Sequence, residues 1–469
     1  MVGAGVAGLN ALSSAKPYLD RGDVVVVDRR AAPGGMWNDT YDYVRLHQPH
    51  PMFTVGAVPW STGQSRAHLA TKPEIQRHLE RCTAEVFAGL SVTELYESEY
   101  LSHEEVEGDG RRVVVRIRDA DGNLFRVVAR TLIKAYGFNV WPKEPLRLSS
   151  EAVRSVTPHD ASLFEDDSPV WVVGSGKTAM DTVAKLVERH PGRRIHMIAG
   201  SGTVFLNRAI GFPEGLRAFF GGTTGFRIAL DVSTRFDGTN GPAVADHFRD
   251  RYGLSLHPAS RHHAFGIISP QEMAAVRDGV TEVKLGHLRD VRDGVGGPEL
   301  VLDDGSTREI PEGSFVVSCT GYLDADLEYE PFRSPGGAVL SVSARSALHL
   351  LTTHTGFALP HLHFRGHLDR LPFYELDAVL LRRKDKVSWA SVMYVHSLYN
   401  MLLIIDALPP DVLETMGVNL DNWYPLPRRL WDLVEIKRRG SEHVDRSRRI
   451  LDRVRGRYEG VACGPLASG

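Results

Sequence analysis

The spacing of apolar and polar positions predicts a strand–helix–strand unit in the middle of the chain. PVWVV (169–173) and RIHMIAG (194–200) are short apolar runs that indicate buried strands. Between them, KTAMDTVAKLVERH (177–190) has the apolar spacing of a helix. Gly174 and Gly176 stand between the first strand and the helix. The order strand, glycine turn, helix and strand is typical of a nucleotide-binding unit.

The string GSGKT (174–178) has two interpretations. A phosphate loop for ATP or GTP needs a glycine five positions before the Gly-Lys pair, and Trp171 occupies that position. A dinucleotide turn needs a small third residue where helix and strand pack, and Ala179 supplies it. The sequence therefore predicts a dinucleotide site. We expect its contacts from five consecutive residues: Gly174, Ser175, Gly176, Lys177 and Thr178.

The N-terminal segment carries a second copy of this motif. VGAGVAGL (2–9) has the pattern G-x-G-x-x-G, with glycines at Gly3, Gly5 and Gly8. The strand DVVVVDRR (23–30) ends in Asp28, whose carboxylate suits a ribose hydroxyl pair. The chain begins two residues before Gly3, so either the start is truncated or misassigned, or the usual first strand is very short. Two such motifs on one chain predict two bound dinucleotides.

The two copies differ at the end of their second strand. The second copy ends in AGSG (199–202), which has no carboxylate to repel a 2′-phosphate. The polar and basic residues near it are Arg193, Arg194, Ser201, Thr203 and Arg208. We therefore predict FAD in the first site and NADPH in the second, with contacts from Ser201 and Arg208. The alternative for each arginine is a solvated surface position.

Bulk properties narrow the class of protein. The 469 residues, 42% of them hydrophobic and 24% charged, predict a globular protein of two or three domains. A net charge of −3 argues against nucleic-acid binding. The longest aliphatic run, MLLIIDAL (401–408), is shorter than a membrane span, so we expect a buried helix and no membrane span. The three cysteines form no CxxC pair, and no targeting segment is evident, so we expect a cytoplasmic location.

These motifs give the chain a resemblance to the class B flavoprotein monooxygenases, which include flavin N- and S-oxygenases and Baeyer–Villiger enzymes. Besides the two glycine turns, the segments that carry it are GGMW (34–37), KAYGFNVWPKEP (134–145) and VVSCTGY (316–322). The family fingerprint before the second turn is degraded to VRSVTPH (153–159), which keeps His159. No tryptophan follows His159 at the place where the Baeyer–Villiger subset usually has one, which weighs against that subset.

The resemblance implies an α/β fold with two Rossmann-like dinucleotide-binding domains. A discontinuous FAD domain would comprise residues 1–163 and 315–469, with the NADP domain at 164–314 inserted into it. It also implies that HLHFRGHL (361–368) is a late strand, after which Gly366 opens a helix near the FAD pyrophosphate. The further cofactor contacts it implies are Gly35, Met36, Trp37, Thr320, Gly321 and Gly366.

The same resemblance implies where the chemistry occurs. The segment YDYVRLHQPHPMF (41–53) lies against the reactive edge of the flavin in the family, so Arg45, His47 and Gln48 are the candidate catalytic residues. The alternative is that this segment is a plain connection. In the family, NADPH reduces the flavin, which then reacts with O₂ at C4a to give a peroxyflavin. Such a site must exclude water, and few catalytic side chains are needed.

The leading prediction is therefore an FAD- and NADPH-dependent monooxygenase that oxygenates a small molecule at nitrogen or sulfur. The alternatives are Baeyer–Villiger oxidation of a ketone, an NADPH-dependent reductase without oxygen insertion, and a non-catalytic flavoprotein. Whether the protein forms a homodimer is left open. The sequence also predicts an irregular excursion at 221–241, a solvated helix at 437–457 and no metal site, the RHHAF pair (261–265) included.

Overall fold

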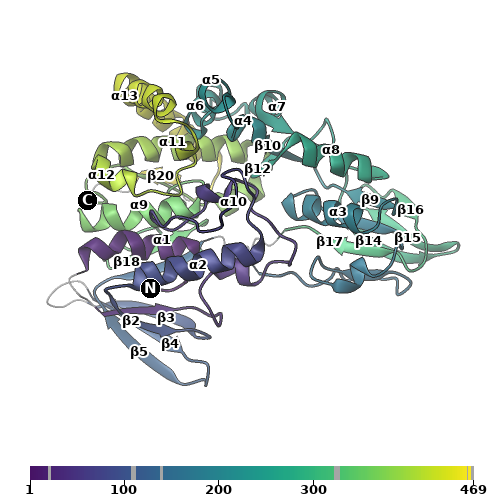
Figure 1. The fold of residues 1–469 in the computed structure, drawn as a ribbon, viewed down its shortest axis with the longest axis horizontal. Coiled ribbons are helices and arrows are strands. Elements are labelled where there is room, and N and C mark those ends of the chain that lie inside the picture. The colour runs from purple at the N-terminus through teal and green to yellow at the C-terminus, as the bar shows by residue number, and fades with distance from the viewer. Residues whose placement is uncertain (20–22, 107–111, 138–140, 322–327, 462, 466–469) are drawn as a thin grey trace.

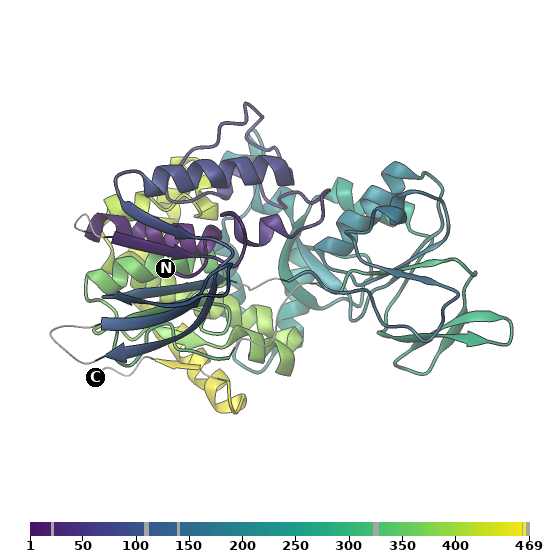
Figure 2. The same cartoon turned by 90° about the horizontal axis from the view of Figure 1, so that it is seen from below.

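The computed structural model describes residues 1–19, 23–106, 112–137, 141–321, 328–461 and 463–465. Each glycine turn belongs to its own parallel sheet, and the two sheets form separate lobes (Figures 1 and 2). Residue 322 of the VVSCTGY segment and residues 138–140 of the KAYGFNVWPKEP segment lie outside the described residues.

The first lobe is built on a parallel sheet with helices on one face and an antiparallel meander on the other. Val2 bridges Val27 and Lys134 and so lies between β1 and β6 in this sheet. The strands are β1 (Asp23–Val27), β2 (Ser91–Leu95), β6 (Leu132–Gly137) and β18 (Val339–Ser343). The helices are α1 (Val6–Ala15), α2 (Lys72–Phe87) and α9 (Thr352–Phe364). The meander consists of β3 (Glu99–Val106), β4 (Arg112–Arg118) and β5 (Leu124–Ala129).

The second lobe repeats this plan around five parallel strands in the order β13-β9-β8-β17-β7. The strands are β7 (Arg154–Val156), β8 (Val170–Val173), β9 (Ile195–Ile198), β13 (Glu282–Lys284) and β17 (Phe315–Ser318). Helices α3 (Lys177–Arg189) and α8 (Pro270–Gly279) cover one face. The antiparallel strands β14 (Leu288–Gly294), β15 (Gly297–Leu302) and β16 (Thr307–Glu309) pack on the other. The predicted strand–helix–strand unit is confirmed as β8, α3 and β9.

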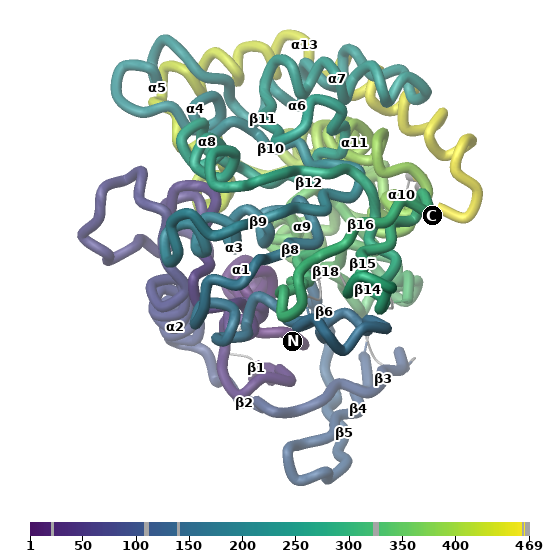
Figure 3. Tube along the Cα trace, turned by 90° about the vertical axis from the view of Figure 1, so that its right-hand side faces the viewer, coloured from purple at the N-terminus to yellow at the C-terminus, as the bar shows by residue number. Residues whose placement is uncertain are grey.

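A third group of elements joins the middle of the chain to its C-terminal part (Figure 3). From the middle come β10 (Thr203–Asn207), β11 (Gly253–Leu254), β12 (His262–Ile268), α4 (Arg208–Gly211), α5 (Arg217–Phe220), α6 (Gly225–Arg235) and α7 (Gly241–Tyr252). From the C-terminal part come β19 (Tyr374–Leu376), α10 (Ala378–Lys384), α11 (Lys386–Ala407), α12 (Pro410–Glu414), α13 (Leu426–Arg457) and β20 (Cys463–Pro465). One apolar core, which includes Val232, Phe248, Val392 and Leu451, holds the two sets together.

Helix α11 is the buried helix expected around residues 401–408. Among the described residues it is the one helix long and apolar enough to cross a membrane, but 83% of the relevant window is buried inside the protein. It therefore serves as a core helix. The expected solvated helix at 437–457 is the C-terminal part of α13, although one side of it, including Ile450 and Leu451, is buried.

Two predictions about local structure are wrong. The segment 221–241 is not an irregular excursion, because most of it forms α6, which Thr224 caps and which buries Ile228 and Val232. The segment 361–368 is not a strand, because α9 runs to Phe364. Gly366, at φ +69°, lies just beyond the end of α9 and does not open a helix.

The strands β7 and β17 bear on the predicted division at residues 163 and 315. Both belong to the sheet of the second glycine turn, and β7 lies before residue 163 while β17 begins at 315. A division that follows the sheets would therefore extend the second domain beyond both predicted boundaries.

Candidate functional site

The first glycine turn has no room for side chains at its first and third glycines. Gly3 has φ +94°, and a Cβ atom there would lie 2.4 Å from the carbonyl oxygen of Ala135. A Cβ atom on Gly8 would lie 2.0 Å from the carbonyl oxygen of Gly3. Asp28 holds the turn, because one of its carboxylate oxygens accepts the amide of Ala4 at 2.7 Å. The structure therefore shows Asp28 stabilising the turn, while its contact with a ribose stays a prediction.

The GGMW segment lies directly against this turn. A Cβ atom on Gly35, which has φ +60°, would lie 2.8 Å from the Cα atom of Gly5. Trp37 is buried and meets Phe53 edge to face at 5.5 Å between ring centroids, while Met36 stays partly exposed. This close contact fixes the loop after β1 over the start of α1.

Helix α9 brings a second N-terminus beside that of α1. A Cβ atom on Gly356 would lie 2.4 Å from the carbonyl oxygen of Ala7, and farther along, Tyr18 contacts His361 at 2.9 Å. The two helices therefore run parallel, with their N-termini side by side. Free N–H groups and the positive ends of two helix dipoles suit an anion such as a pyrophosphate.

Sequence reasoning missed this feature and chose Gly366 instead. The thirteen residues of α9 span about 20 Å, so Gly366 lies at the far end from the turn. In the first two turns of α9, Thr355 Oγ1 and His354 Nδ1 are buried with no hydrogen-bond partner among the described residues. The signal in the sequence was TTHTG (352–356), in which Gly356 permits the close approach of the two helices.

The second glycine turn combines one crowded and one open glycine. Gly174 has φ +127°, and a Cβ atom there would lie 2.3 Å from the carbonyl oxygen of Cys319. Thr320 and Gly321 follow Cys319, so they lie beside this turn. In contrast, a Cβ atom on Gly176 would meet nothing within 4 Å. Gly176 is the N-cap of α3, so this open space lies at the N-terminus of that helix, the kind of place where a phosphate binds.

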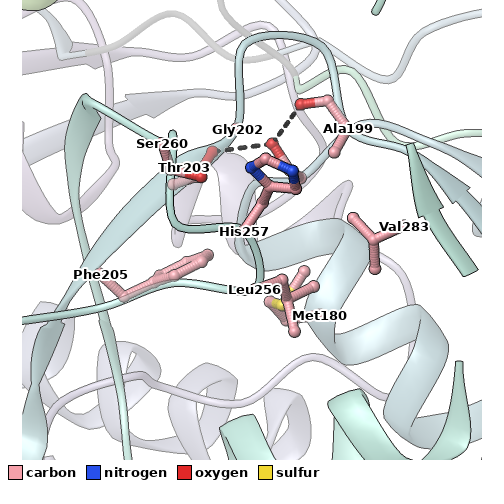
Figure 4. Close-up of a pocket in the computed structure, with 10 residues that line it drawn as sticks. Met180, Ala199, Gly202, Thr203, Phe205, Leu256, His257, Ser260 and Val283 are labelled. Atoms are coloured by element: carbon pink, nitrogen blue, oxygen red, sulfur yellow. Dashed lines mark hydrogen bonds between the residues drawn. The ribbon is translucent and has the colours of Figure 1, made fainter. Parts of the chain in front are cut away.

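The neighbouring edge of the same sheet is almost filled (Figure 4). A cavity of about 10 Å³ remains there, enough for about one water, and its lining includes Gly202, His257 and Ser260. Ser175 bonds inward to the carbonyl oxygen of Ala199 at 2.8 Å, so its hydroxyl is already used, while Ser201 is exposed.

The segment 41–53 links the first lobe to helix α3. The Tyr41 hydroxyl donates to Asp181 at 2.8 Å, and the Tyr43 hydroxyl lies 3.0 Å from Thr182 Oγ1. Asp181 also forms an ion pair with Lys177. Burial raises the pKa of Asp181, and the charge of Lys177 opposes that shift. The segment is thus more than a plain connection, since it contacts the helix that opens at the second turn.

Of the three predicted catalytic residues, His47 contacts α4 and β12 of the third group of elements. The carbonyl oxygen of His47 accepts from Arg208 Nε at 2.8 Å, and His47 Nδ1 accepts the amide of Ile267 at 3.1 Å. Burial, reinforced by Lys177 and Arg208, lowers the pKa of His47 to about 3, so the ring is neutral. Gln48 Oε1 and Arg208 Nη2 are both buried without a hydrogen-bond partner among the described residues.

The remaining predicted site residues have different surroundings. Arg208 pairs with Glu272 and does not stand free beside Ser201, so the structure does not support its predicted contact with a 2′-phosphate. Arg193 is buried and donates to the carbonyl oxygens of Leu163 and Ser168. The side chain of Arg45 is exposed and does not join the junction.

No group of three or more potential metal ligands occurs in the part of the chain that the structure describes. His262 and His263 are buried, and their Nδ1 atoms bond to the backbone carbonyls of Lys386 and Val204. These two histidines therefore have structural surroundings.

No protein family profile matches the chain. Its curated relatives include uncharacterized proteins of Mycobacterium tuberculosis and Mycobacterium bovis, which are 25% identical over 346 residues. The match covers 68% of this chain and 59% of those proteins, so the chain spans less than two thirds of their length.

The fold resembles several solved flavoenzymes. They include a flavin monooxygenase variant from Stenotrophomonas maltophilia (16% identity, 78% of this chain and 97% of that chain, TM-score 0.49). A second is S-allyl-L-cysteine S-oxygenase from Allium sativum (15%, 95% and 94%, TM-score 0.47). A third is bacillithiol disulfide reductase from Staphylococcus aureus (10%, 78% and 96%, TM-score 0.48). At these values the likeness assigns no activity to this chain.

Proposed function

We propose that this protein is an oxidoreductase that binds FAD at the first glycine turn and NADPH at the second. One observation carries the proposal: each turn has at least one glycine, Gly3 and Gly8 in the first and Gly174 in the second, where a Cβ atom would overlap backbone, and each turn opens a helix beside a parallel sheet. Orphaned polar atoms at the start of α9 and at Gln48 supply hydrogen-bonding groups that a bound cofactor would satisfy.

Within this class we favour a monooxygenase that uses O₂ to oxygenate a small molecule at nitrogen or sulfur. When bound, FAD supplies hydride acceptance from NADPH and the reaction with oxygen. No CxxC pair exists in the sequence, and Cys82 and Cys319 are both buried. Burial raises the pKa of Cys319 to about 12, which disfavours its thiolate. An electron acceptor other than a protein dithiol is therefore needed, and O₂ fits.

The chain's own residues have distinct roles in this proposal. The N-termini of α1 and α9 bind the FAD pyrophosphate, and Asp28 orders the turn and faces the ribose. Gln48 and Arg208 hold cofactor or substrate through their unused polar atoms. Neutral His47 does not donate a proton from a cationic ring, because it accepts the amide of Ile267. Its role is to position Arg208 through its carbonyl oxygen.

The test uses the full chain loaded with FAD. NADPH is added without oxygen, and bleaching of the flavin absorbance reports reduction. The reduced protein is then mixed with ¹⁸O₂ and a panel of amines and thioethers, and the masses of the products are measured by mass spectrometry. Incorporation of one labelled oxygen atom into a product supports the monooxygenase.

Two other outcomes separate the alternatives. Labelled ester from a ketone panel would indicate Baeyer–Villiger oxidation. Rapid NADPH oxidation with all oxygen recovered as hydrogen peroxide, and no labelled product from any panel, would favour a reductase without oxygen insertion. Failure to bind FAD at all would reject the proposal.

Gln48→Ala and Arg208→Gln test whether the unpaired polar atoms of these two side chains bind cofactor or substrate. Arg45→Gln is the matched control, because the Arg45 side chain is exposed. We expect each of the first two to raise the NADPH concentration needed for half-maximal flavin bleaching by about tenfold. This factor corresponds to the loss of one charge-assisted hydrogen bond. The Arg45 variant should leave it unchanged. Equal effects in all three variants would contradict the assigned roles.

A further inference from the structure

Exposed apolar side chains gather on α5 and on the first half of α13. Phe220 is 86% exposed and Trp431 is 72% exposed. The full set, called here the α5/α13 patch, is Leu216, Phe219, Phe220, Leu426, Leu430, Trp431, Leu433 and Val434. Most of the exposed large hydrophobic side chains among the described residues belong to it. A concentration of this kind marks an interaction surface.

The polarity of this part of α13 is inverted. The buried residue is the acid Asp432, which accepts from Thr224 Oγ1 at 2.7 Å and from Arg227 Nε at 2.5 Å. Its neighbours Trp431 and Leu433 point to solvent. These hydrogen bonds of Asp432 fix the rotation of α13 about its axis. The apolar side chains on its outer side are therefore held in an ordered helix and do not belong to a frayed end.

The two elements of the patch are tied together. Arg428 Nη2 donates to the carbonyl oxygen of Gly222 at 3.3 Å, two residues after Phe220. Figures 1 and 3 show α5 and α13 at the same end of the molecule. The patch is therefore one surface that the middle and the C-terminal part of the chain build jointly.

Helix α13 has a charge unlike that of the whole protein. It contains eleven Lys and Arg residues and five Asp and Glu residues, while the chain has a net charge of −3. By helical periodicity, Lys437, Arg448 and Arg455 follow Leu430 along the same side of the helix, and all three are exposed. An apolar surface thus continues into a cationic row.

We propose that the α5/α13 patch docks onto the surface of an anionic lipid bilayer. Trp, Phe and Leu side chains enter the boundary between headgroups and acyl chains, and the cationic row meets the lipid phosphates. The attachment lies on the membrane and does not span it, since α11 is a core helix. A second copy of this chain would present the same cationic surface, so it supplies no complementary charge.

The experiment measures co-sedimentation of the full-length protein with vesicles. One set contains phosphatidylcholine alone, and the other contains equal parts of phosphatidylcholine and phosphatidylglycerol. We expect binding to the second set that weakens as salt is added. Leu430→Ser combined with Trp431→Ser should weaken binding by more than about tenfold, because two apolar side chains no longer enter the boundary.

Lys437→Gln should weaken binding about fivefold, the effect of one cation near an anionic surface. The matched control is Leu124→Ser on β5, a leucine that is 70% exposed against 48% for Leu430 and lies far from the patch in sequence, and it should bind like the unmodified protein. Unchanged thermal melting of all variants shows that each is folded.

Three results would overturn the proposal. The first is no sedimentation with anionic vesicles, and the second is sedimentation that the Leu430/Trp431 variant leaves unchanged. The third is a dimer in light scattering that this variant dissociates, without vesicle binding, which would assign the patch to a second copy.

Discussion

At the scale of single residues, the two glycine turns separate structural from binding roles. Gly3, Gly8 and Gly174 are required by the fold, because a Cβ atom at each would overlap backbone. Gly176 is different, since a Cβ atom there meets nothing and its φ is −78°. A glycine that the fold does not need points to a ligand that approaches the backbone.

Gly176→Ala tests this distinction. We expect the free energy of unfolding to change by less than about 1 kcal/mol, the usual range for an N-cap exchange. The dissociation constant for NADPH should rise at least about tenfold, because the methyl group fills the space that a phosphate oxygen needs to reach the N–H groups. Thermal melting and a binding titration measure the two quantities.

Gly456→Ala is the matched control, because this exposed helical glycine also has nothing within 4 Å of its Cβ position. It should leave NADPH binding unchanged. An unaltered NADPH affinity in the Gly176 variant would mean that the second turn does not bind the phosphates.

At the scale of elements, the contact between α1 and α9 determines whether their N-termini meet. Gly356 makes that contact possible, since the backbone of Ala7 occupies the place of its missing side chain. A glycine-to-alanine substitution should therefore have opposite effects on stability in α9 and in α13.

Gly356→Ala should destabilise the protein by about 1–3 kcal/mol, the cost of overpacking, and should lower the FAD content because the helix N-termini separate. Gly440→Ala in α13 should instead stabilise it by about 0.5–1 kcal/mol, since the nearest atom, Ile436 Cγ2, is 3.9 Å away. Chemical denaturation and the flavin absorbance of the purified protein measure both effects. Equal effects of the two substitutions would contradict the proposed helix contact.

The sequence was sufficient to predict elements whose pattern is local. The glycine spacing and the flanking apolar runs predicted β8, α3 and β9, and Asp28 was correctly located at the end of β1. Prediction from the sequence failed for α9, because this helix is buried on nearly all sides and therefore has no apolar stripe. The strand predicted at 361–368 came from the family resemblance and not from a local pattern. Helix α6 was missed because the glycines around it in 221–241 indicated a loop, although Ile228, Ala229 and Val232 have helical spacing and are buried.

The candidate site was predictable only in part. His47 and Gln48 were chosen from the position of their segment; His47 contacts Arg208 of α4 and Gln48 Oε1 is buried, while their part in catalysis stays a prediction. The pairing of Arg208 with Glu272 joins residues far apart in sequence, so charge and proximity along the chain suggested a phosphate contact instead.

At the scale of the whole molecule, buried histidines give stability a dependence on pH. Burial lowers the pKa of His47 and His354 to about 3, and that of His262, His263 and His396 to about 4. The folded protein holds these rings neutral, while the unfolded chain takes up protons below its ordinary pKa of about 6.5. Their contribution is constant above that value and falls as the pH drops towards 4.

We therefore expect the melting temperature to be flat from about pH 8 to 7 and to fall steeply below about pH 6, with each histidine costing at most about 1.4 kcal/mol per pH unit. Scanning calorimetry across this range measures the slope. His263→Gln should reduce the slope by the share of one histidine, because the substituted side chain takes up no proton. A melting temperature that rises on acidification would contradict this account.

The core shared by α6, α7, α11 and α13 also has a consequence for protein synthesis. Helices α6 and α7 leave the ribosome first, but the side chains that cover Val232 and Phe248 belong to helices made much later. At about 5–20 residues per second, the intervening stretch takes roughly 10–40 s to translate. During that time the nascent chain carries an uncovered apolar surface, so its yield in a cell should depend on chaperones that bind such surfaces before the last helix emerges.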